Sequence, residues 1–209
     1  MAERSSQARA DLAAIFAGGE GRRMGGVDKA TLMLGGRPLW RIASARLAPQ
    51  ADAFAVLAPK QPAWLEGLPG ARWIADAPEL RGPPAGVLAA LRLLERQQGP
   101  GALLLTAPVD SPFAPDDLFE KLDAARRHAS APAAIVRHAG RLQPVFGVWQ
   151  AGCAAAFAAA AEHERTLHGI AMRAGAIACE AWADAAPDPF TNLNTPEDLA
   201  AAERAIGHG

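Results

Sequence analysis

The sequence predicts an α/β protein with an open, mostly parallel sheet that is covered by helices on both faces. Along the first 128 residues, short apolar segments typical of buried strands alternate with segments of helical spacing. The chain has 209 residues, of which 50% are hydrophobic and 21% charged, so it is long enough for a substantial core. Polar or glycine-rich loops follow the predicted strands. Because ligands bind at the carboxyl ends of the strands in open α/β sheets, these loops indicate a binding site.

The elements of the first half follow from this alternation. Apolar runs predict strands at residues 12–16, 53–57, 72–74 and 102–105. The last run is continuously apolar, as expected of a central parallel strand. Helical spacing predicts helices at residues 38–48, 87–94 and 118–125, and a shorter one near Trp64.

The pattern changes after His128. Residues 133–137 and 145–149 have strand character and are joined by a short link, which predicts an antiparallel hairpin or an edge extension of the sheet. Further elements are predicted as helices at 152–161 and 167–174, a strand near Ile177 and a last helix from Thr195 and Pro196. We see no repeat or linker and expect a single domain over 1–209, with halves of about 11–128 and 129–209.

Charge and composition exclude several classes of function. The formal net charge is −1, so no generally basic surface argues for nucleic acid as a partner. Cys153 and Cys179 are too few for a disulfide scaffold and lack metal-ligand spacing, so we expect buried free thiols. The five histidines also lack such spacing and are expected to be surface or capping groups. The first apolar run is too short for a signal peptide or membrane span, which predicts a cytoplasmic protein with no membrane partner.

The stretch 17–29, AGGEGRRMGGVDK, is the feature around which the rest of the chain is organised. Glycines can adopt positive φ and turn successive N–H groups into one concavity, which favours phosphate. Arg22, Arg23 and Lys29 add positive charge to this stretch. A flexible surface loop with solvated charges is the alternative, but the stretch directly follows a predicted strand. We therefore expect a small phosphorylated ligand.

Three further polar segments occupy comparable places. Asp76 follows the third predicted strand, the GPPAG segment at 82–86 opens a helix, and Asp110 lies just past the fourth strand. Near the end of the chain, residues 192–199 read NLNTPEDL. Structural roles are also open: Asp110 as a helix cap, Asp76 as a turn residue, and the two asparagines bonded to their own backbone.

Together these segments closely resemble, in order, the motifs of the molybdenum cofactor guanylyltransferases. Residues 17–29 are similar to the family's N-terminal signature, 82–86 to its Gly-Pro-x-Ala-Gly, 110–112 to its Asp-x-Pro and 192–197 to its Asn-x-Asn-Thr-Pro-Glu. This resemblance implies a three-layer Rossmann-like nucleotidyltransferase fold. It also implies transfer of GMP from GTP to the phosphate of the molybdenum-molybdopterin cofactor, with pyrophosphate released and Mg2+ as the metal. GTP, the molybdopterin cofactor and proteins that mature molybdoenzymes are the implied partners.

The same resemblance implies roles for individual residues. The implied nucleotide-binding residues are Phe16, Ala17, Gly18, Gly19, Gly21, Gly25, Lys29, Asp76, Gly82, Gly86 and Asp110. Arg23, Lys29 and Asp110 are implied to be catalytic, and Asp110 is the implied metal ligand. Asn192 and Asn194 are implied to lie on the acceptor side, so 11–128 becomes the nucleotide half and 129–209 the acceptor half.

Phosphoryl chemistry explains why these residue types are needed. A phosphate oxygen must approach the α-phosphorus of a nucleoside triphosphate while pyrophosphate leaves, and both reactants are anions. Mg2+ held by Asp110 can neutralise phosphate oxygens, while glycine-loop amides, Arg23 and Lys29 stabilise the leaving pyrophosphate. Because the nucleophile is already anionic, no nucleophilic side chain is required.

Departures from the family pattern keep alternatives open. The family's asparagine after the second strand is absent from Val56-Leu57-Ala58-Pro59-Lys60, and its His-Pro is Gln143-Pro144 here. Val109 also replaces the cysteine before Asp110. The sequence therefore constrains the identity of the nucleobase and of the acceptor less than it constrains the phosphate chemistry. A CTP-dependent or sugar-phosphate nucleotidyltransferase and a non-catalytic cofactor-binding homologue are the alternatives.

Overall fold

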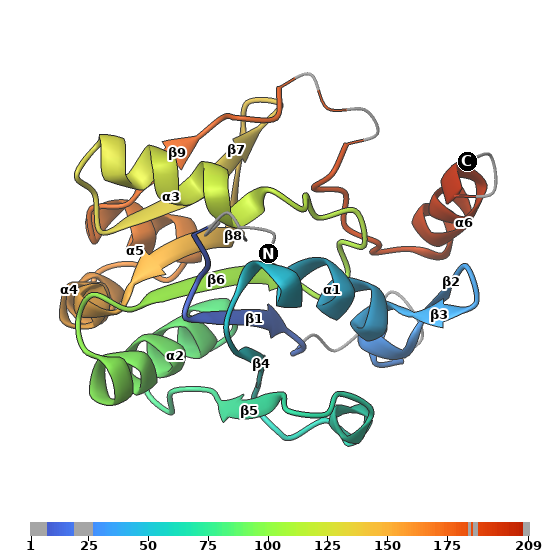
Figure 1. Ribbon diagram of the computed structural model, residues 1–209, viewed down its shortest axis with the longest axis horizontal. Helices are drawn as coiled ribbons and strands as arrows, with labels where there is room; N and C mark the ends of the chain where they lie inside the picture. Colours follow the sequence, from blue (N-terminus) through green and yellow to red (C-terminus); the bar gives the residue numbers. More distant parts are fainter. Residues whose placement is uncertain (1–7, 19–26, 184, 186–187, 207–209) are drawn as a thin grey trace, which may run out of the picture.

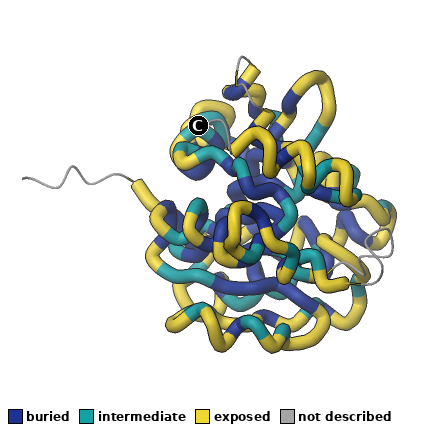
Figure 2. Tube along the Cα trace, turned by 90° about the vertical axis from the view of Figure 1, so that its right-hand side faces the viewer, coloured by how far each residue is buried: buried dark blue, intermediate teal, exposed yellow. Residues whose placement is uncertain are grey.

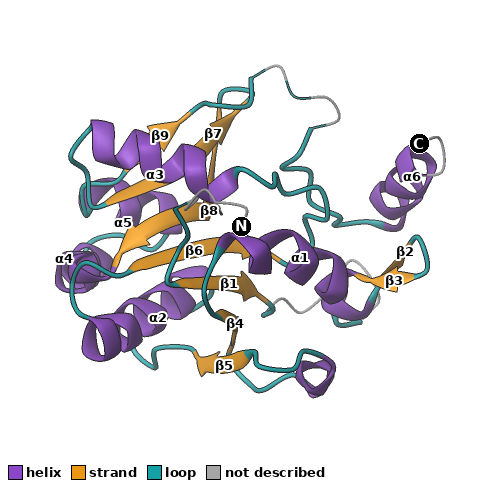
Figure 3. Ribbon diagram, viewed as in Figure 1, coloured by secondary structure: helices purple, strands orange, loops and turns teal. Residues whose placement is uncertain are grey.

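The computed structural model describes residues 8–18, 27–183, 185 and 188–206. A seven-stranded sheet forms its centre, in the order β5-β4-β1-β6-β8-β7-β9 (Figures 1 and 3). The strands are β1 (Leu12–Phe16), β4 (Phe54–Ala58), β5 (Arg72–Ala75), β6 (Leu103–Pro108), β7 (Ala133–His138), β8 (Arg141–Gln150) and β9 (Ile177–Cys179). Strands β5, β4, β1 and β6 pair in parallel, whereas β8 runs antiparallel to both of its neighbours. The predicted α/β class, with a mostly parallel sheet and an antiparallel hairpin, is confirmed.

Helices cover both faces of this sheet, which gives three layers. Helices α2 (Pro83–Gln98), α4 (Ala154–Ala161) and α5 (Leu167–Arg173) pack on one face. Helices α1 (Leu39–Leu47) and α3 (Leu118–His128) pack on the other. Along β1, Leu12 and Ala14 belong to the first core, and Ala13 and Ile15 to the second. Because both faces are buried, the central strands read as continuous apolar runs, and Figure 2 shows this buried interior under exposed outer surfaces.

A small second sheet was not predicted from the sequence. Strands β2 (Met33–Leu34) and β3 (Arg37–Pro38) form a hairpin whose turn places Gly35 and Gly36 at φ of 55° and 71°. Two consecutive residues at positive φ are typical of a type I′ turn and favour glycine. Each strand has only two residues, which is too short to produce a recognisable pattern.

The last helix, α6 (Pro196–Ile206), packs beside this hairpin, apart from the main sheet (Figure 1). The shared apolar cluster consists of Leu34, Leu39, Ile42, Leu193 and Ala202. Glu203 Oε1 also accepts a hydrogen bond of 2.9 Å from the backbone N–H of Gly35. These contacts attach the end of the chain to the segment that follows the glycine-rich stretch.

The remaining elements within the described residues are short 3-10 helices at Lys29–Thr31, Ala48–Gln50, Ala63–Gly67 and Ala151–Cys153. The element predicted near Trp64 is therefore confirmed as one turn of this kind. The predicted bounds of some elements differ from the observed ones by a few residues. Strand β6, for example, starts at Leu103 and continues to Pro108. No helix in the described part of the chain is long and apolar enough to cross a membrane.

The prediction for the two cysteines is confirmed, whereas the prediction for the histidines is wrong at one position. Cys153 and Cys179 are buried free thiols, as predicted. The expectation that every histidine is a surface or capping group is wrong for His138, which is only 8% exposed. Its ring lies 5.2 Å from that of Phe190, and its Nε2 is 3.3 Å from Asp188 Oδ1. The alternation of β7 explains this burial, because His138 shares a face with Val136, which packs in the core.

Candidate functional site

The carboxyl ends of the parallel strands meet at one edge of the sheet and position two adjacent cavities there. Phe16, the last residue of β1, is in register with Leu57 of β4 and with Pro108 of β6. The backbone N–H of Val109 donates to the Phe16 carbonyl at 3.1 Å, which continues the pairing just beyond β6. The cavities measure about 380 Å³ and about 250 Å³ and share Phe16, Gly18 and Pro83 in their walls.

The smaller cavity contains a cluster of one cation, one carboxylate and one amide. Lys29 Nζ donates hydrogen bonds of 2.7 Å to Asp110 Oδ2 and 2.5 Å to Asn194 Oδ1. The Lys29 and Asp110 side chains are only 18% and 15% exposed. Its walls are formed by Phe16, Ala17, Gly18, Asp28, Lys29, Pro83, Pro108, Val109, Asp110, Val145, Asn192 and Asn194.

The asparagine-containing segment is fixed along the loop after β6. The carbonyl of Asp110 accepts a 2.8 Å hydrogen bond from the backbone N–H of Leu193. Ser111 Oγ, in a fully buried residue, donates to Asn192 Oδ1 at 2.5 Å. The asparagine side chains are therefore held at the cavity by residues distant in the sequence, Asn192 by Ser111, 81 positions away, and Asn194 by Lys29, 165 positions away, not by bonds to their own backbone.

The first turn of α6 fixes the backbone of Asn194. Asp198 Oδ2 accepts hydrogen bonds of 2.9 Å from the backbone N–H groups of both Asn194 and Thr195. In return, Thr195 Oγ1 accepts from the Asp198 N–H at 3.2 Å, so the predicted cap is confirmed as one half of a reciprocal capping box. The Asn194 N–H, together with that of Thr195, lowers the pKa of Asp198.

Lys29 lies on a 3-10 turn that hydrogen bonds of Asp28 hold in place. Asp28 caps this 3-10 turn by accepting a 3.0 Å hydrogen bond from the Ala30 N–H. Its second carboxylate oxygen accepts from the indole Nε1 of Trp64 at 2.9 Å. The Trp64 ring stacks on that of Trp40, with centroids 5.7 Å apart and planes at 6°. No sequence signal indicated a link between Trp64 and the site, because 36 residues separate Trp64 from Asp28.

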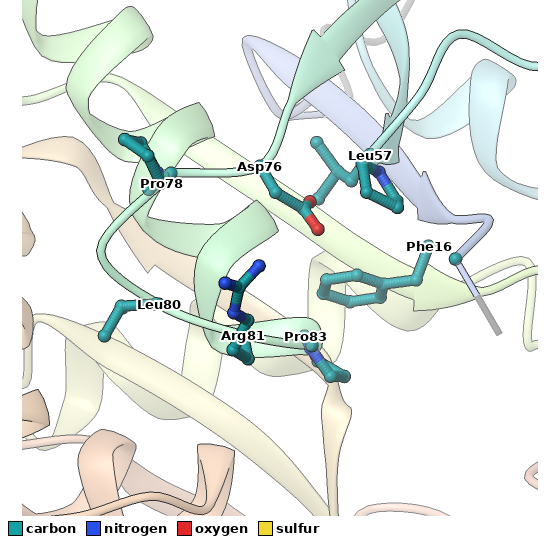
Figure 4. Close-up of a pocket in the computed structure, with 11 residues that line it drawn as sticks. Phe16, Leu57, Asp76, Pro78, Leu80, Arg81 and Pro83 are labelled. Atoms are coloured by element: carbon teal, nitrogen blue, oxygen red, sulfur yellow. The ribbon is translucent and has the colours of Figure 1, made fainter.

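The larger cavity lies beside the first one, between the end of β4 and the loop that opens α2 (Figure 4). Its lining residues are Phe16, Gly18, Leu57, Pro59, Asp76, Ala77, Pro78, Leu80, Arg81, Gly82 and Pro83. Burial raises the pKa of the Asp76 carboxyl group. Sequence reasoning found Asp76 but missed Arg81, because a single arginine before a Gly-Pro pair carries no recognisable signal.

Two glycines allow the close packing behind this cavity. A Cβ on Gly86, in the first turn of α2, would lie 3.1 Å from Leu57 Cβ and 3.4 Å from Phe16 Cε1. A Cβ on Gly18 would lie 2.9 Å from Pro59 Cδ. Gly86 therefore lets α2 approach β1 and β4, and Gly18 lets the chain after β1 approach the end of β4.

The predicted site residues fall into three groups. The structure brings Phe16, Ala17, Gly18, Lys29, Asp76, Gly82, Asp110, Asn192 and Asn194 to the two cavities. Gly86 lies behind them in van der Waals range of Phe16. The other predicted residues, Gly19, Gly21, Arg23 and Gly25, lie outside the described residues. Within the described ranges, no group of three or more His, Cys, Asp or Glu side chains could hold a metal ion. Of the described carboxylates, two line the smaller cavity: Asp110 contacts Lys29, and Asp28 accepts hydrogen bonds from Ala30 and Trp64.

Comparisons with known proteins find relatives that match most of the chain. The family model of the MobA-like NTP transferase domain matches residues 13–176. A molybdenum cofactor guanylyltransferase of Cereibacter sphaeroides is 45% identical over 193 residues, which cover 92% of this chain and 95% of that protein. An enzyme of the same name from Rhodopseudomonas palustris (strain HaA2) is 40% identical over 196 residues, covering 91% and 90%.

Solved structures show the same fold. Molybdopterin-guanine dinucleotide biosynthesis protein A of Archaeoglobus fulgidus superposes with a TM-score of 0.76 at 24% identity, covering 95% of this chain and all of that chain. A 4-diphosphocytidyl-2C-methyl-D-erythritol synthase superposes with a TM-score of 0.66 at 13% identity, covering 96% and 100%. At these identities the likeness shows the architecture alone.

Proposed function

The chain belongs to the MobA-like NTP transferase family, with molybdenum cofactor guanylyltransferases among its relatives, and we propose that it transfers GMP from GTP to the phosphate of the molybdenum-molybdopterin cofactor. The cluster of Lys29, Asp110 and Asn194 carries this proposal. It joins three motifs separated by 81 and 165 residues at the carboxyl edge of a Rossmann-like nucleotidyltransferase sheet. The reaction forms a bond from the acceptor phosphate oxygen to the α-phosphorus and breaks the bond to the leaving pyrophosphate.

The smaller cavity is the proposed place of the triphosphate. Lys29 supplies a cation there whose side chain is only 18% exposed. From the glycine-rich motif alone, residues 19–26 are proposed to supply backbone N–H groups suited to phosphate. Arg23 and the glycines at 19, 21 and 25 are assigned to the same role by their motif positions alone. The positive groups offset the repulsion between two anionic reactants and stabilise pyrophosphate as it leaves.

Asp110 is the proposed ligand of a divalent metal, which we take to be Mg2+. This ion prefers oxygen ligands and is commonly held by one or two carboxylates together with substrate phosphates. The Asp110 carboxylate lines the smaller cavity and fits that mode of binding, whereas the Asp28 carboxylate already accepts hydrogen bonds from Ala30 and Trp64. When bound, Mg2+ neutralises charge on the phosphate oxygens. Lys29, which contacts Asp110, is proposed to bind the same phosphates.

The larger cavity is the proposed place of the nucleobase. It adjoins the smaller one through Phe16, Gly18 and Pro83, so one nucleotide can span both. Its wall combines the aromatic ring of Phe16 and apolar groups with the Asp76 carboxylate (Figure 4). Gly82 and Gly86 shape the opposite wall by admitting the turn and the close approach of α2.

The acceptor is proposed to enter from the side of Asn192 and Val145, where β8 borders the smaller cavity. This placement agrees with a nucleotide half of about 11–128 and an acceptor half of about 129–209 within a single domain. That division stays a prediction, as do the cytoplasmic location and contacts with proteins that mature molybdoenzymes.

Turnover of purified protein tests the proposal. With Mg2+, GTP and molybdenum-loaded molybdopterin, we expect stoichiometric pyrophosphate and a dinucleotide product whose mass contains GMP. Parallel reactions contain CTP, or a sugar phosphate as the acceptor. Turnover with CTP and none with GTP would support the CTP-dependent alternative. Binding of both substrates without pyrophosphate release would support a non-catalytic homologue.

A further inference from the structure

The loop between β5 and α2 presents a carboxylate and a guanidinium to the larger cavity. Asp76 stands at its start, Arg81 near its end, and both line the cavity. Figure 4 shows the two charged groups pointing into the same space, next to the ring of Phe16. Within the described ranges, neither side chain takes part in an ion pair, whereas Glu79 of the same loop is paired with Arg92. The cavity therefore contains one set of hydrogen-bond acceptors and one of donors that have no protein partner there.

The loop is held in place by its own hydrogen bonds. The Ala77 N–H donates to the Ala85 carbonyl in the first turn of α2 at 3.1 Å, and the Leu80 N–H donates to the Ala77 carbonyl at 3.2 Å. Gly82 follows Arg81 at a φ of 64°, a value that favours glycine, and the helix then starts at Pro83. The attachment points of Asp76 and Arg81 are thus fixed relative to each other.

This pair of groups matches one nucleobase. Guanine presents the N1–H and the 2-amino group as neighbouring donors, and O6 and N7 as neighbouring acceptors. A carboxylate can accept from both donors, and a guanidinium fork can donate to both acceptors. Adenine and cytosine carry an amino group where guanine has O6, so either base would set a donor against the donors of Arg81 and leave these groups unpaired.

We propose that Arg81 is a specificity-determining residue that selects guanine by donating to O6 and N7, while Asp76 accepts from the N1–H and 2-amino groups. The Phe16 ring and the neighbouring Leu57 and Pro59 provide the apolar surface on which a flat base lies. This inference rests on the proposed function and adds to it the residue that distinguishes GTP from other nucleotides.

The test uses Arg81→Met, which keeps an unbranched apolar stem and removes the guanidinium donors. Dissociation constants are measured by calorimetry with Mg2+ for GTP, ITP, ATP and CTP. We expect Arg81→Met to weaken GTP and ITP about equally, by about 5- to 100-fold, because both retain O6 and N7. Binding of ATP and CTP, which lack O6, should change less than twofold. Arg96→Met, on an exposed arginine in the last turn of α2 that lines neither cavity, is the matched control.

Asp76→Asn supplies the complementary measurement. ITP lacks the 2-amino group, so wild-type protein should bind GTP more tightly than ITP, and Asp76→Asn should abolish that difference. If Arg81→Met weakened the binding of all four nucleotides equally, Arg81 would contact phosphate or ribose and not the base. If it weakened the binding of none, Arg81 would make no contact with the nucleotide. Either result overturns the inference. Guanine-selective binding by a protein that releases no pyrophosphate would contradict the proposed function alone.

Discussion

The ammonium group of Lys29 lies 2.7 Å from Asp110 Oδ2, although 81 positions separate the two residues in the sequence. Both side chains are less than one-fifth exposed, so solvent screens this pair less than a surface ion pair. Each group is the kind that a metal-bound triphosphate requires: a cation for phosphate and a carboxylate for the metal. The pair therefore places the two charges of the proposed reaction within one small cavity.

Replacing Lys29 by methionine removes the cation while keeping much of the side-chain volume. Charge-assisted hydrogen bonds contribute about 1.5–3 kcal/mol, so we expect GTP affinity to fall by about 10- to 100-fold. Calorimetry with Mg2+ and GTP measures this change. Lys60→Met is the control, because Lys60 is exposed and lines neither cavity. Unaltered affinity in Lys29→Met would remove Lys29 from phosphate binding.

Asp198 is expected to affect the site from the first turn of α6. Its carboxylate holds the Asn194 backbone, and Asn194 in turn contacts Lys29, so Asp198→Ala should lower kcat/KM for GTP several-fold. Glu197→Ala removes the same charge from the same helical turn without touching Asn194 and should leave kcat/KM unchanged. Equal effects of the two variants would mean that only the helix charge matters.

Thermal unfolding gives a second test of Asp198 through pH. The Asn194 N–H lowers the pKa of Asp198 in the folded protein, so the ionised carboxylate stabilises the fold at pH values above the unfolded-state pKa. This contribution is lost as pH falls through the lower folded-state pKa. We expect the Tm difference between wild type and Asp198→Ala to be present at neutral pH and to shrink below about pH 4.

Protonation of Asp76 should weaken GTP binding in mild acid. Burial raises the pKa of this carboxyl group, so it takes up a proton at a higher pH than an ordinary aspartate. A protonated carboxyl cannot accept from both guanine donors, so affinity should fall as pH drops through the raised pKa. Asp76→Asn should bind GTP more weakly and lose this pH dependence, leaving the titration of GTP itself. Parallel pH profiles would contradict the assignment.

A core hydrogen bond allows a test of the fold that is independent of the site. The indole Nε1 of Trp149 donates to Thr106 Oγ1 at 3.0 Å, and both residues are at most 1% exposed. Thr106→Val leaves this donor unsatisfied and should lower the free energy of unfolding by about 1–3 kcal/mol. Denaturant titration measures the loss, with Thr191→Val at an exposed position as control. Unchanged stability would show that the buried donor finds another partner.

Periodicity was sufficient to predict most of the strands and helices around the site. Runs such as β1 are buried on both faces and leave a clear apolar pattern, whereas the β2–β3 hairpin has strands of two residues and leaves none. The motifs indicated Lys29, Asp110 and Asn194 separately. Their mutual contact depends on how α6 returns to the hairpin, and no local pattern encodes that path.

Arg81 and Trp64 show a second limit of sequence reasoning. Trp64 contacts Asp28, and Arg81 lines a cavity whose other walls come from residues distant in the chain. Arginine and tryptophan also occur on surfaces without a specific role. A single arginine or tryptophan outside a motif predicts nothing specific. Only the tertiary structure shows that Trp64 braces Asp28 and that Arg81 faces Asp76 across a cavity.

The most direct test of the account is the rate of pyrophosphate release by Asp110→Asn, titrated with Mg2+ in the presence of GTP and molybdenum-loaded molybdopterin. Asp116→Asn, at an exposed residue paired with Arg46, is the matched control. Loss of a preorganised electrostatic group typically costs about 100- to 1,000-fold in rate, so we predict a loss of this size for Asp110→Asn and none for Asp116→Asn. A wild-type rate and Mg2+ dependence in Asp110→Asn would contradict the assignment of metal and catalysis to this cavity.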